Sequence, residues 1–243
     1  MTEHLKEIAA QLTRDLKLDM PPVQVSYLDS PPAGVPEHPG GVPSVCTFFA
    51  QGTEKAFYAG LPKHEDCEIG AFVLGIPPEG DAGARLMGTI GTMQKEGYLN
   101  PGEEARVPHN ATPPKYVAYG PLGSLPMAPT SVLIFARPDS AMLAVETAGA
   151  GADVKPVPMN GRPMCAIMPI MNGGAPVAVS LGCIGSRIYT EMGDNRMVVG
   201  IRGDHLDQFA KKLSGIVHAN QWVHDEDSRR KKESSHPYHR AGA

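Results

Sequence analysis

The segment Ala178-Val179-Ser180-Leu181-Gly182-Cys183-Ile184-Gly185-Ser186-Arg187 decides how the fold is interpreted, because an apolar strand runs directly into a glycine-rich turn. Residues 177–180 have the apolar character of a short buried strand. Glycines at 182 and 185 allow a positive φ or a close backbone approach, so the chain can reverse sharply there. The segment therefore predicts short strands linked by irregular turns, with helices packed against them.

Other parts of the chain repeat this pattern of short strands and capped helices. Leu5, Ile8, Leu12 and Leu16 recur at helical spacing, and further helices are predicted over residues 81–97, 139–149 and 204–216. A doubly wound parallel sheet would need longer and more regular units, so we predict an α+β fold with a mixed sheet. The other predicted strands are residues 23–28, 44–49, 55–59, 115–120, 132–136, 164–168 and 197–201.

Two stretches of the chain, about 20–120 and 130–220, share a similar order of elements. In each stretch, a first strand is followed by a predicted strand that contains a cysteine, then by another strand, and then by a second cysteine with a glycine within three residues after it. Cys67 lies 21 residues after Cys46, and Cys183 lies 18 residues after Cys165. This order predicts one globular domain over residues 1–224, built from two similar halves. The charged residues that follow predict a flexible tail over 225–243.

The net charge of −4, from 22 basic and 26 acidic residues, supplies no overall field that attracts nucleic acid or an anionic membrane. The first residues lack the basic start and apolar run of a signal peptide, and no stretch of about 18 apolar residues is present. We therefore expect a cytoplasmic protein without nucleic-acid or membrane partners. In a reducing compartment its four cysteines are expected to be thiols, metal ligands or redox groups rather than disulfides.

The turn around Cys67 combines an imidazole, carboxylates and a thiol within Lys63-His64-Glu65-Asp66-Cys67-Glu68-Ile69-Gly70. If a helix begins at Cys67, its free N–H groups would stabilise the thiolate and lower the thiol pKa. The thiolate would then serve as nucleophile, redox group or metal ligand. The alternative is a cysteine buried as a small apolar residue in a glycine-permitted turn.

The turn around Cys183 adds groups suited to an anion. Gly182, Gly185 and Ser186 are candidate ligand-binding residues, and Arg187 can hold a carboxylate or phosphate by two parallel hydrogen bonds. The alternative is that the glycines serve only the turn and Arg187 makes a surface or interface pair.

Cys46 and Cys165 lie in predicted strands, where buried packing is the leading interpretation. Together with the two turn cysteines they would give four thiols for a metal ion or an iron–sulfur cluster, with His64 as a further ligand or proton-transfer group. The spacing differs from the paired cysteines of zinc ribbons and the compact run of bacterial ferredoxins, so convergence is a hypothesis.

The segments 45–49 and 66–70, and above all Ser180-Leu181-Gly182-Cys183-Ile184-Gly185-Ser186-Arg187, resemble the uncharacterised ArCR family of bacterial and archaeal proteins. The resemblance extends over most of residues 20–220. It implies a single family unit and draws attention to Cys67 and Cys183. It carries no activity over to this chain.

These features lead to a cysteine-centred redox or metal-dependent protein that binds an iron–sulfur centre, another thiophilic metal or a reactive substrate. One alternative is a non-catalytic sensor in which the glycine turns and Arg187 bind a small anion. Another is an accessory subunit of a redox complex. A homo-oligomer or a complex with a redox partner protein is compatible with each of these functions.

Overall fold

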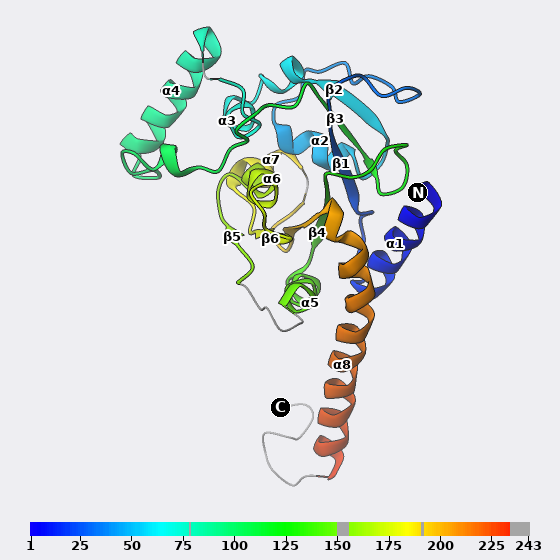
Figure 1. Ribbon diagram of the computed structural model, residues 1–243. Helices are drawn as coiled ribbons and strands as arrows, with labels where there is room; N and C mark the ends of the chain where they lie inside the picture. The colour runs from blue at the N-terminus through cyan, green and yellow to red at the C-terminus, as the bar shows by residue number, and fades with distance from the viewer. Residues whose placement is uncertain (78, 150–155, 191, 234–243) are drawn as a thin grey trace.

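The computed structural model describes residues 1–77, 79–149, 156–190 and 192–233, and its centre is one mixed sheet of seven strands (Figure 1). The strand order is β2-β3-β1-β4-β7-β6-β5, and every neighbouring pair is antiparallel except β5 and β6. The predicted α+β class is confirmed. The strands are β1 (Val23–Leu28), β2 (Phe57–Gly60), β3 (Tyr116–Pro121), β4 (Ser131–Ala136), β5 (Met159–Asn160), β6 (Val177–Ser180) and β7 (Met197–Arg202).

The strand order is nearly palindromic about the junction between β1 and β4. Moving outward from that junction, the first half places β1, β3 and β2, and the second half places β4, β7 and β6. Figure 1 shows the first-half strands in the upper part of the sheet and the second-half strands below them. A duplicated three-strand unit would give this order, and the duplication itself stays a prediction.

The residue pairing between neighbouring strands has the same symmetry about the junction between β1 and β4. Six pairs join β1 to β3, from Val23↔Pro121 to Leu28↔Tyr116, and six pairs join β4 to β7, from Ser131↔Arg202 to Ala136↔Met197. Val23 and Ser131 therefore occupy equivalent positions, as do Gln24 and Val132. At the junction Gln24 pairs with Val132, so equivalent positions of the two halves face each other. The two halves are thus related by an approximate two-fold axis through this pair.

Helices cover both faces of the sheet. On one face lie α2 (Val45–Gln51), α3 (Glu68–Val73) and α6 (Ile167–Asn172), with α7 (Ile184–Tyr189) against α2. On the other lie α1 (Thr2–Asp15), α5 (Pro138–Gly149) and α8 (Leu206–Glu233). In Figure 1, α4 (Gly80–Lys95) stands away from the sheet beyond α3. Short 3-10 turns lie at Leu61–His64, Glu104–Arg106, Met164–Ala166 and Gly203–His205.

The alternation of side chains along the strands explains the two apolar layers. In β4, Leu133 and Phe135 belong to the layer under α2 and α6, whereas Val132 and Ile134 belong to the layer under α1, α5 and α8. All four side chains are almost fully buried. A strand that is buried on both faces has a continuous run of apolar residues in its sequence. Residues 132–136 were predicted as a strand from such a run.

Two predicted strands are wrong, and both carry cysteines. Residues 44–49 form the start of α2, where the Ser44 hydroxyl accepts a hydrogen bond from the Cys46 amide at 3.2 Å and caps the helix. Residues 164–168 form a 3-10 turn that runs into α6. Both stretches are short, apolar and buried, and periodicity alone does not separate a buried strand from a buried helix of this length.

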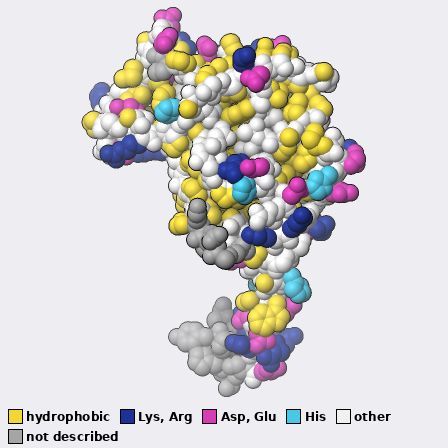
Figure 2. Space-filling view, in the orientation of Figure 1, with side chains coloured by type: hydrophobic (Ala, Val, Ile, Leu, Met, Phe, Trp, Pro, Cys, Tyr) yellow, Lys and Arg dark blue, Asp and Glu magenta, His cyan; other side chains and the backbone are white. Residues whose placement is uncertain are grey.

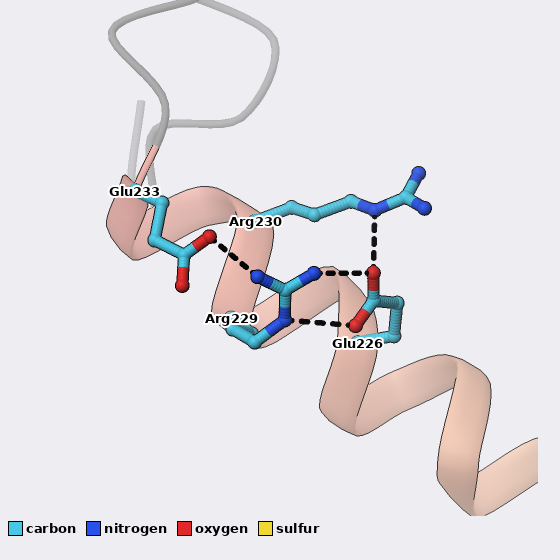
Figure 3. Close-up of polar contacts among 4 residues, drawn as sticks. All are labelled: Glu226, Arg229, Arg230 and Glu233. Carbon is cyan, nitrogen blue, oxygen red and sulfur yellow. Dashed lines mark hydrogen bonds and ion pairs between the residues drawn. The ribbon is translucent and has the colours of Figure 1, made fainter.

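The last helix is longer than predicted, because α8 continues to Glu233 through residues assigned to a flexible tail. Arg229 pairs with Glu226 and Glu233, and Arg230 also pairs with Glu226 (Figure 3). Pairs three and four residues apart favour a helix, so the charged run extends it. This end of α8 projects from the body and carries both signs of charge (Figures 1 and 2). Residues 234–243 of the predicted tail lie outside the described residues.

Two glycines, one in the 3-10 turn before α8 and one within α8, give a matched test of the packing around this helix. A Cβ at Gly203 would overlap the carbonyl oxygen of Pro129, whereas no described atom lies within 4 Å of a Cβ at Gly215. We expect Gly203→Ala to lower the free energy of unfolding by about 1–3 kcal/mol, the usual cost of overpacking. Gly215→Ala should raise it by roughly 0.5–1 kcal/mol through helix propensity. Urea unfolding of both variants measures this, and equal effects would contradict the packing at Pro129.

Candidate functional site

A cavity of about 650 Å³ lies between the cysteine-bearing helices and α4, and all four cysteines line it. Cys46 comes from α2, Cys67 from the start of α3, Cys165 from the 3-10 turn before α6, and Cys183 from the start of α7. Apolar side chains of α4 and the segment 98–108 form the opposite wall. The structure thus brings together thiols that are separated by more than a hundred residues.

Cys46 and Cys165 form the buried part of this wall, with exposed fractions of 4% and 5%. Each thiol lies in the neighbourhood of the other and affects its ionisation. The neighbouring Cys165 thiol and Ser44 hold the pKa of Cys46 below its ordinary value. The neighbouring Cys46 sulfur and burial raise the pKa of Cys165 well above its ordinary value. The two thiols are therefore unequal, and Cys46 is the one that ionises first.

Cys67 and Cys183 occupy equivalent places, because each is the residue immediately before a short helix. The Cys67 sulfur accepts a hydrogen bond from the Gly70 amide at 3.3 Å, as expected of a capping residue. Burial nevertheless raises the pKa of Cys67, and it outweighs the predicted lowering by the N–H group at the helix start, which the Gly70 amide supplies. At Cys183 the carbonyl accepts a hydrogen bond from the Ser186 hydroxyl at 2.7 Å. Both thiols are half-buried at the cavity wall.

Gly70 allows the first of these helices to approach its neighbour. A Cβ at this position would overlap Val45 of α2 and touch the Cys67 sulfur. Only glycine therefore lets α3 lie this close to α2, and the close approach places Cys67 beside Ser44 and Cys46. The glycine three residues after Cys67 thus serves helix packing beside the cavity.

The thiols do not form a ready ligand set for a single metal ion. Within the described part of the chain, no three His, Cys, Asp or Glu side chains are grouped so that they could hold one. Cys46 is the neighbour that most strongly raises the pKa of Cys165, and Cys67 and Cys183 raise it further. The residues present fit a pair of interacting thiols better than a mononuclear metal centre.

His64, predicted as a secondary ligand, lies away from the cavity lining. Its ring is 1% exposed, with Nδ1 donating to the Gly60 carbonyl at 3.1 Å and Nε2 accepting from the Tyr119 hydroxyl at 2.9 Å. Both ring nitrogens are therefore used within the core. Burial lowers the pKa of His64 to about 4, so the ring is neutral at pH 7.

The predicted anion site around the second turn is divided. Gly185 and Ser186 line the cavity, whereas Gly182 and Arg187 lie outside its lining. The Arg187 guanidinium donates to the carbonyl oxygens of Gly193 and Leu181, each at 2.6 Å, and so holds the turn closed. Gly182 has a φ of +82°, which glycine adopts without strain. These two residues build the turn that carries Cys183.

Two arginines that the sequence analysis did not single out lie at the cavity instead. Arg162 stacks over the Tyr98 ring, with its guanidinium carbon 4.2 Å from the ring centroid, and lies 3.6 Å from a carboxylate oxygen of Glu103. Arg106 also lines the cavity. Arg162 comes from an irregular segment and Arg106 ends the short 3-10 turn Glu104–Arg106, so no periodic pattern in the sequence marked them.

A family model described as uncharacterised ArCR matches residues 11–212. The chain belongs to this family. The match spans both halves of the sheet and all four cysteines, and it confirms the resemblance seen at the cysteine turns. No curated protein and no solved structure matches the chain. Membership in the ArCR family therefore brings no activity with it, and the function must be argued from the cavity.

Across the described residues, no helix has both the length and the apolar character needed to cross a bilayer.

The buried His64 makes stability depend on pH. Its pKa falls from 6.5 in the unfolded chain to about 4 in the fold, so the unfolded chain binds the extra proton as pH falls from about 6.5 to 4. We expect this residue to remove about 3 kcal/mol of stability across that window and nothing further below it. Urea unfolding at both pH values should show a correspondingly smaller loss in His64→Gln than in the wild type.

The exposed His109 supplies the control for this measurement. His109→Gln should keep the wild-type pH dependence. A His64→Gln variant that loses as much stability as the wild type between pH 6.5 and 4 would contradict a neutral, buried His64.

Proposed function

We propose that the chain is a cysteine-centred redox protein that binds a small, largely apolar molecule in the four-cysteine cavity. The observation that supports this most strongly is the convergence of thiols from four separate segments on one cavity wall. Free cysteines are often buried as packing residues, but packing alone does not require all four to share a cavity.

The size and lining of the cavity support a small-molecule ligand. About 650 Å³ falls within the usual range of roughly 300–1,000 Å³ for such sites. Leu86, Ile90 and Met93 supply an apolar wall on α4, and the thiols face it from the sheet side. A few polar groups, among them Ser44 and Arg162, are placed to orient the ligand.

The redox version of the site has more support than the metal-dependent version. Two of its thiols already interact, and one ionises more readily than the other. A metal-dependent site needs three or more ligands around one point, which the described side chains do not supply. The cytoplasmic location, a homo-oligomer and a redox partner stay predictions.

Filling the cavity tests the proposal. A Cβ at Gly185 would lie 3.9 Å from the Cys183 sulfur, an ordinary contact, so a leucine can enter the cavity without backbone strain. With the anionic fluorescent dye 1-anilinonaphthalene-8-sulfonate as probe, we expect Gly185→Leu to raise Kd by about tenfold or more, since it occupies the volume the dye would fill. Saturating dye should also slow the alkylation of Cys67 and Cys183 by N-ethylmaleimide in the wild-type protein.

Gly215→Leu is the matched control, because it adds the same side chain at an open position of α8. It should leave dye binding and alkylation unchanged. Equal dye affinity in Gly185→Leu and the wild type, with no protection of either cysteine, would remove the cavity as a binding site.

Metal and sulfide analysis tests the redox version against the iron–sulfur version. After anaerobic purification we expect far less than one iron and one sulfide per chain, because the described side chains offer no three-ligand group. Four reactive thiols per chain should be titrated after unfolding. Stoichiometric iron and sulfide, lost in both Cys67→Ser and Cys183→Ser, would replace the dithiol proposal with a cluster.

A second candidate function is favoured by the two arginines at the cavity. Arg106 and Arg162 could bind the carboxylate of an anionic ligand without any thiol chemistry, as a sensor would. Under that function Arg162→Met should abolish dye binding while Cys46→Ser leaves it intact and no thiol changes its oxidation state. The redox proposal instead requires a change in the thiols when substrate is added.

A further inference from the structure

The two almost fully buried cysteines are neighbours. Cys46 and Cys165 both line the cavity, and they come from α2 and from the 3-10 turn before α6, which are in contact on one face of the sheet. Each is the neighbour that most strongly affects the ionisation of the other. A disulfide forms between cysteines that adjacent segments bring close together. The pair is therefore poised to switch between dithiol and disulfide.

The surroundings of the pair assign different tasks to the two thiols. Cys46 lies in the first turn of α2, where its backbone amide donates a hydrogen bond to the hydroxyl of Ser44, the capping residue. The neighbouring Cys165 thiol and Ser44 lower the pKa of Cys46 and so favour its thiolate, which is the attacking form in thiol exchange. The neighbouring Cys46 sulfur and burial raise the pKa of Cys165, so that thiol keeps its proton more strongly. Cys46 is thus suited to attack, and Cys165 to resolve what Cys46 forms.

We propose that Cys46 and Cys165 are a dithiol–disulfide couple that reduces an organic disulfide bound in the cavity, with Cys46 as the attacking and Cys165 as the resolving thiol. This inference rests on the proposed redox function and names its substrate class and its reacting pair. The cavity is large enough for an organic molecule on each side of a disulfide bond.

The reaction balances in two exchanges. The Cys46 thiolate attacks one sulfur of the substrate R–S–S–R, a mixed disulfide forms, and R–S⁻ leaves with the proton given up by Cys46. Cys165 then loses its proton and attacks the Cys46 sulfur, which forms the Cys46–Cys165 disulfide and releases the second R–SH. Two electrons pass from the protein to the substrate. A dithiol reductant restores the pair by the reverse exchanges and is itself oxidised to a disulfide.

Cys67 and Cys183 have no part in these exchanges. Each is half-buried at the start of a short helix, and the Cys67 sulfur is engaged with the Gly70 amide. They line the same cavity and carry the same chemical group, so the identity of the joined peptides distinguishes them from the reacting pair.

The test uses bis(2-hydroxyethyl) disulfide with the fully reduced, full-length protein. Mass spectrometry should show the loss of two hydrogens from the intact chain and, after digestion, a peptide pair joined through Cys46 and Cys165. Cys165→Ser should accumulate the mixed disulfide on Cys46. Cys46→Ser should release 2-mercaptoethanol at least about tenfold more slowly, whereas Gly215→Ala, at an open position of α8 outside the cavity, should stay within about twofold of the wild type.

Serine places a hydroxyl group at these buried positions, so Cys46→Ala and Cys165→Ala are measured in parallel as variants without that group. Circular dichroism and thermal unfolding check that every variant is folded. Oxidation that joins Cys67 to Cys183, or equal reaction of all four thiols, would overturn the assignment of the pair. If no disulfide forms while the fluorescent dye still binds the cavity and protects its cysteines, this inference fails and ligand binding stands. Loss of dye binding as well would remove the proposed function itself.

Discussion

Three residue pairs between β1 and β4 join the two halves of the sheet, and the rest of the structure depends on them. The pairing of Gln24 with Val132 places equivalent positions opposite each other, and the cysteine-bearing segments that flank the equivalent strands β2 and β6 lie on the same face. On that face α2 meets the turn before α6, and α3 and α7 begin nearby. If β4 paired with β1 one residue out of register, the side chains of one half would move from one apolar layer to the other face of the sheet. The register at this junction therefore also controls on which face the thiols lie.

The approximate symmetry positions the thiols, and departures from it give them different chemistry. Cys46 and Cys165 are equivalent in order along the chain, but Cys46 follows a serine cap and Cys165 follows a proline that offers no side-chain cap. The interaction between the two thiols increases this difference, because it lowers the pKa of Cys46 and raises that of Cys165. Likewise Cys67 caps α3 with its sulfur, whereas Cys183 makes no such bond in α7. Two similar halves can thus supply one cavity with an unequal pair.

The sequence predicted the scaffold better than the site. Strands such as 132–136 and 177–180 were recognisable because their apolar runs end at glycine or charged residues, and the first helix because Leu5, Ile8 and Leu12 share one face. Residues 44–49 failed because an aromatic, β-branched run resembles a strand, and the cap at Ser44 is a weaker signal than the run itself. Cys46 and Cys165 are buried, as expected, but they come from helical segments at the cavity rather than from strands. Arg162 could not be foreseen, since its stacking on Tyr98 depends on how two irregular segments meet.

The central claim is that thiols from both halves converge on one wall of a shared cavity. Dibromobimane measures this directly, because it becomes fully fluorescent only when it links two nearby thiols. In the native, reduced protein the account predicts one bridge per chain, mapped by mass spectrometry to a cysteine of the first half, 46 or 67, and one of the second, 165 or 183. Single, unbridged additions at all four cysteines in a folded chain would contradict it.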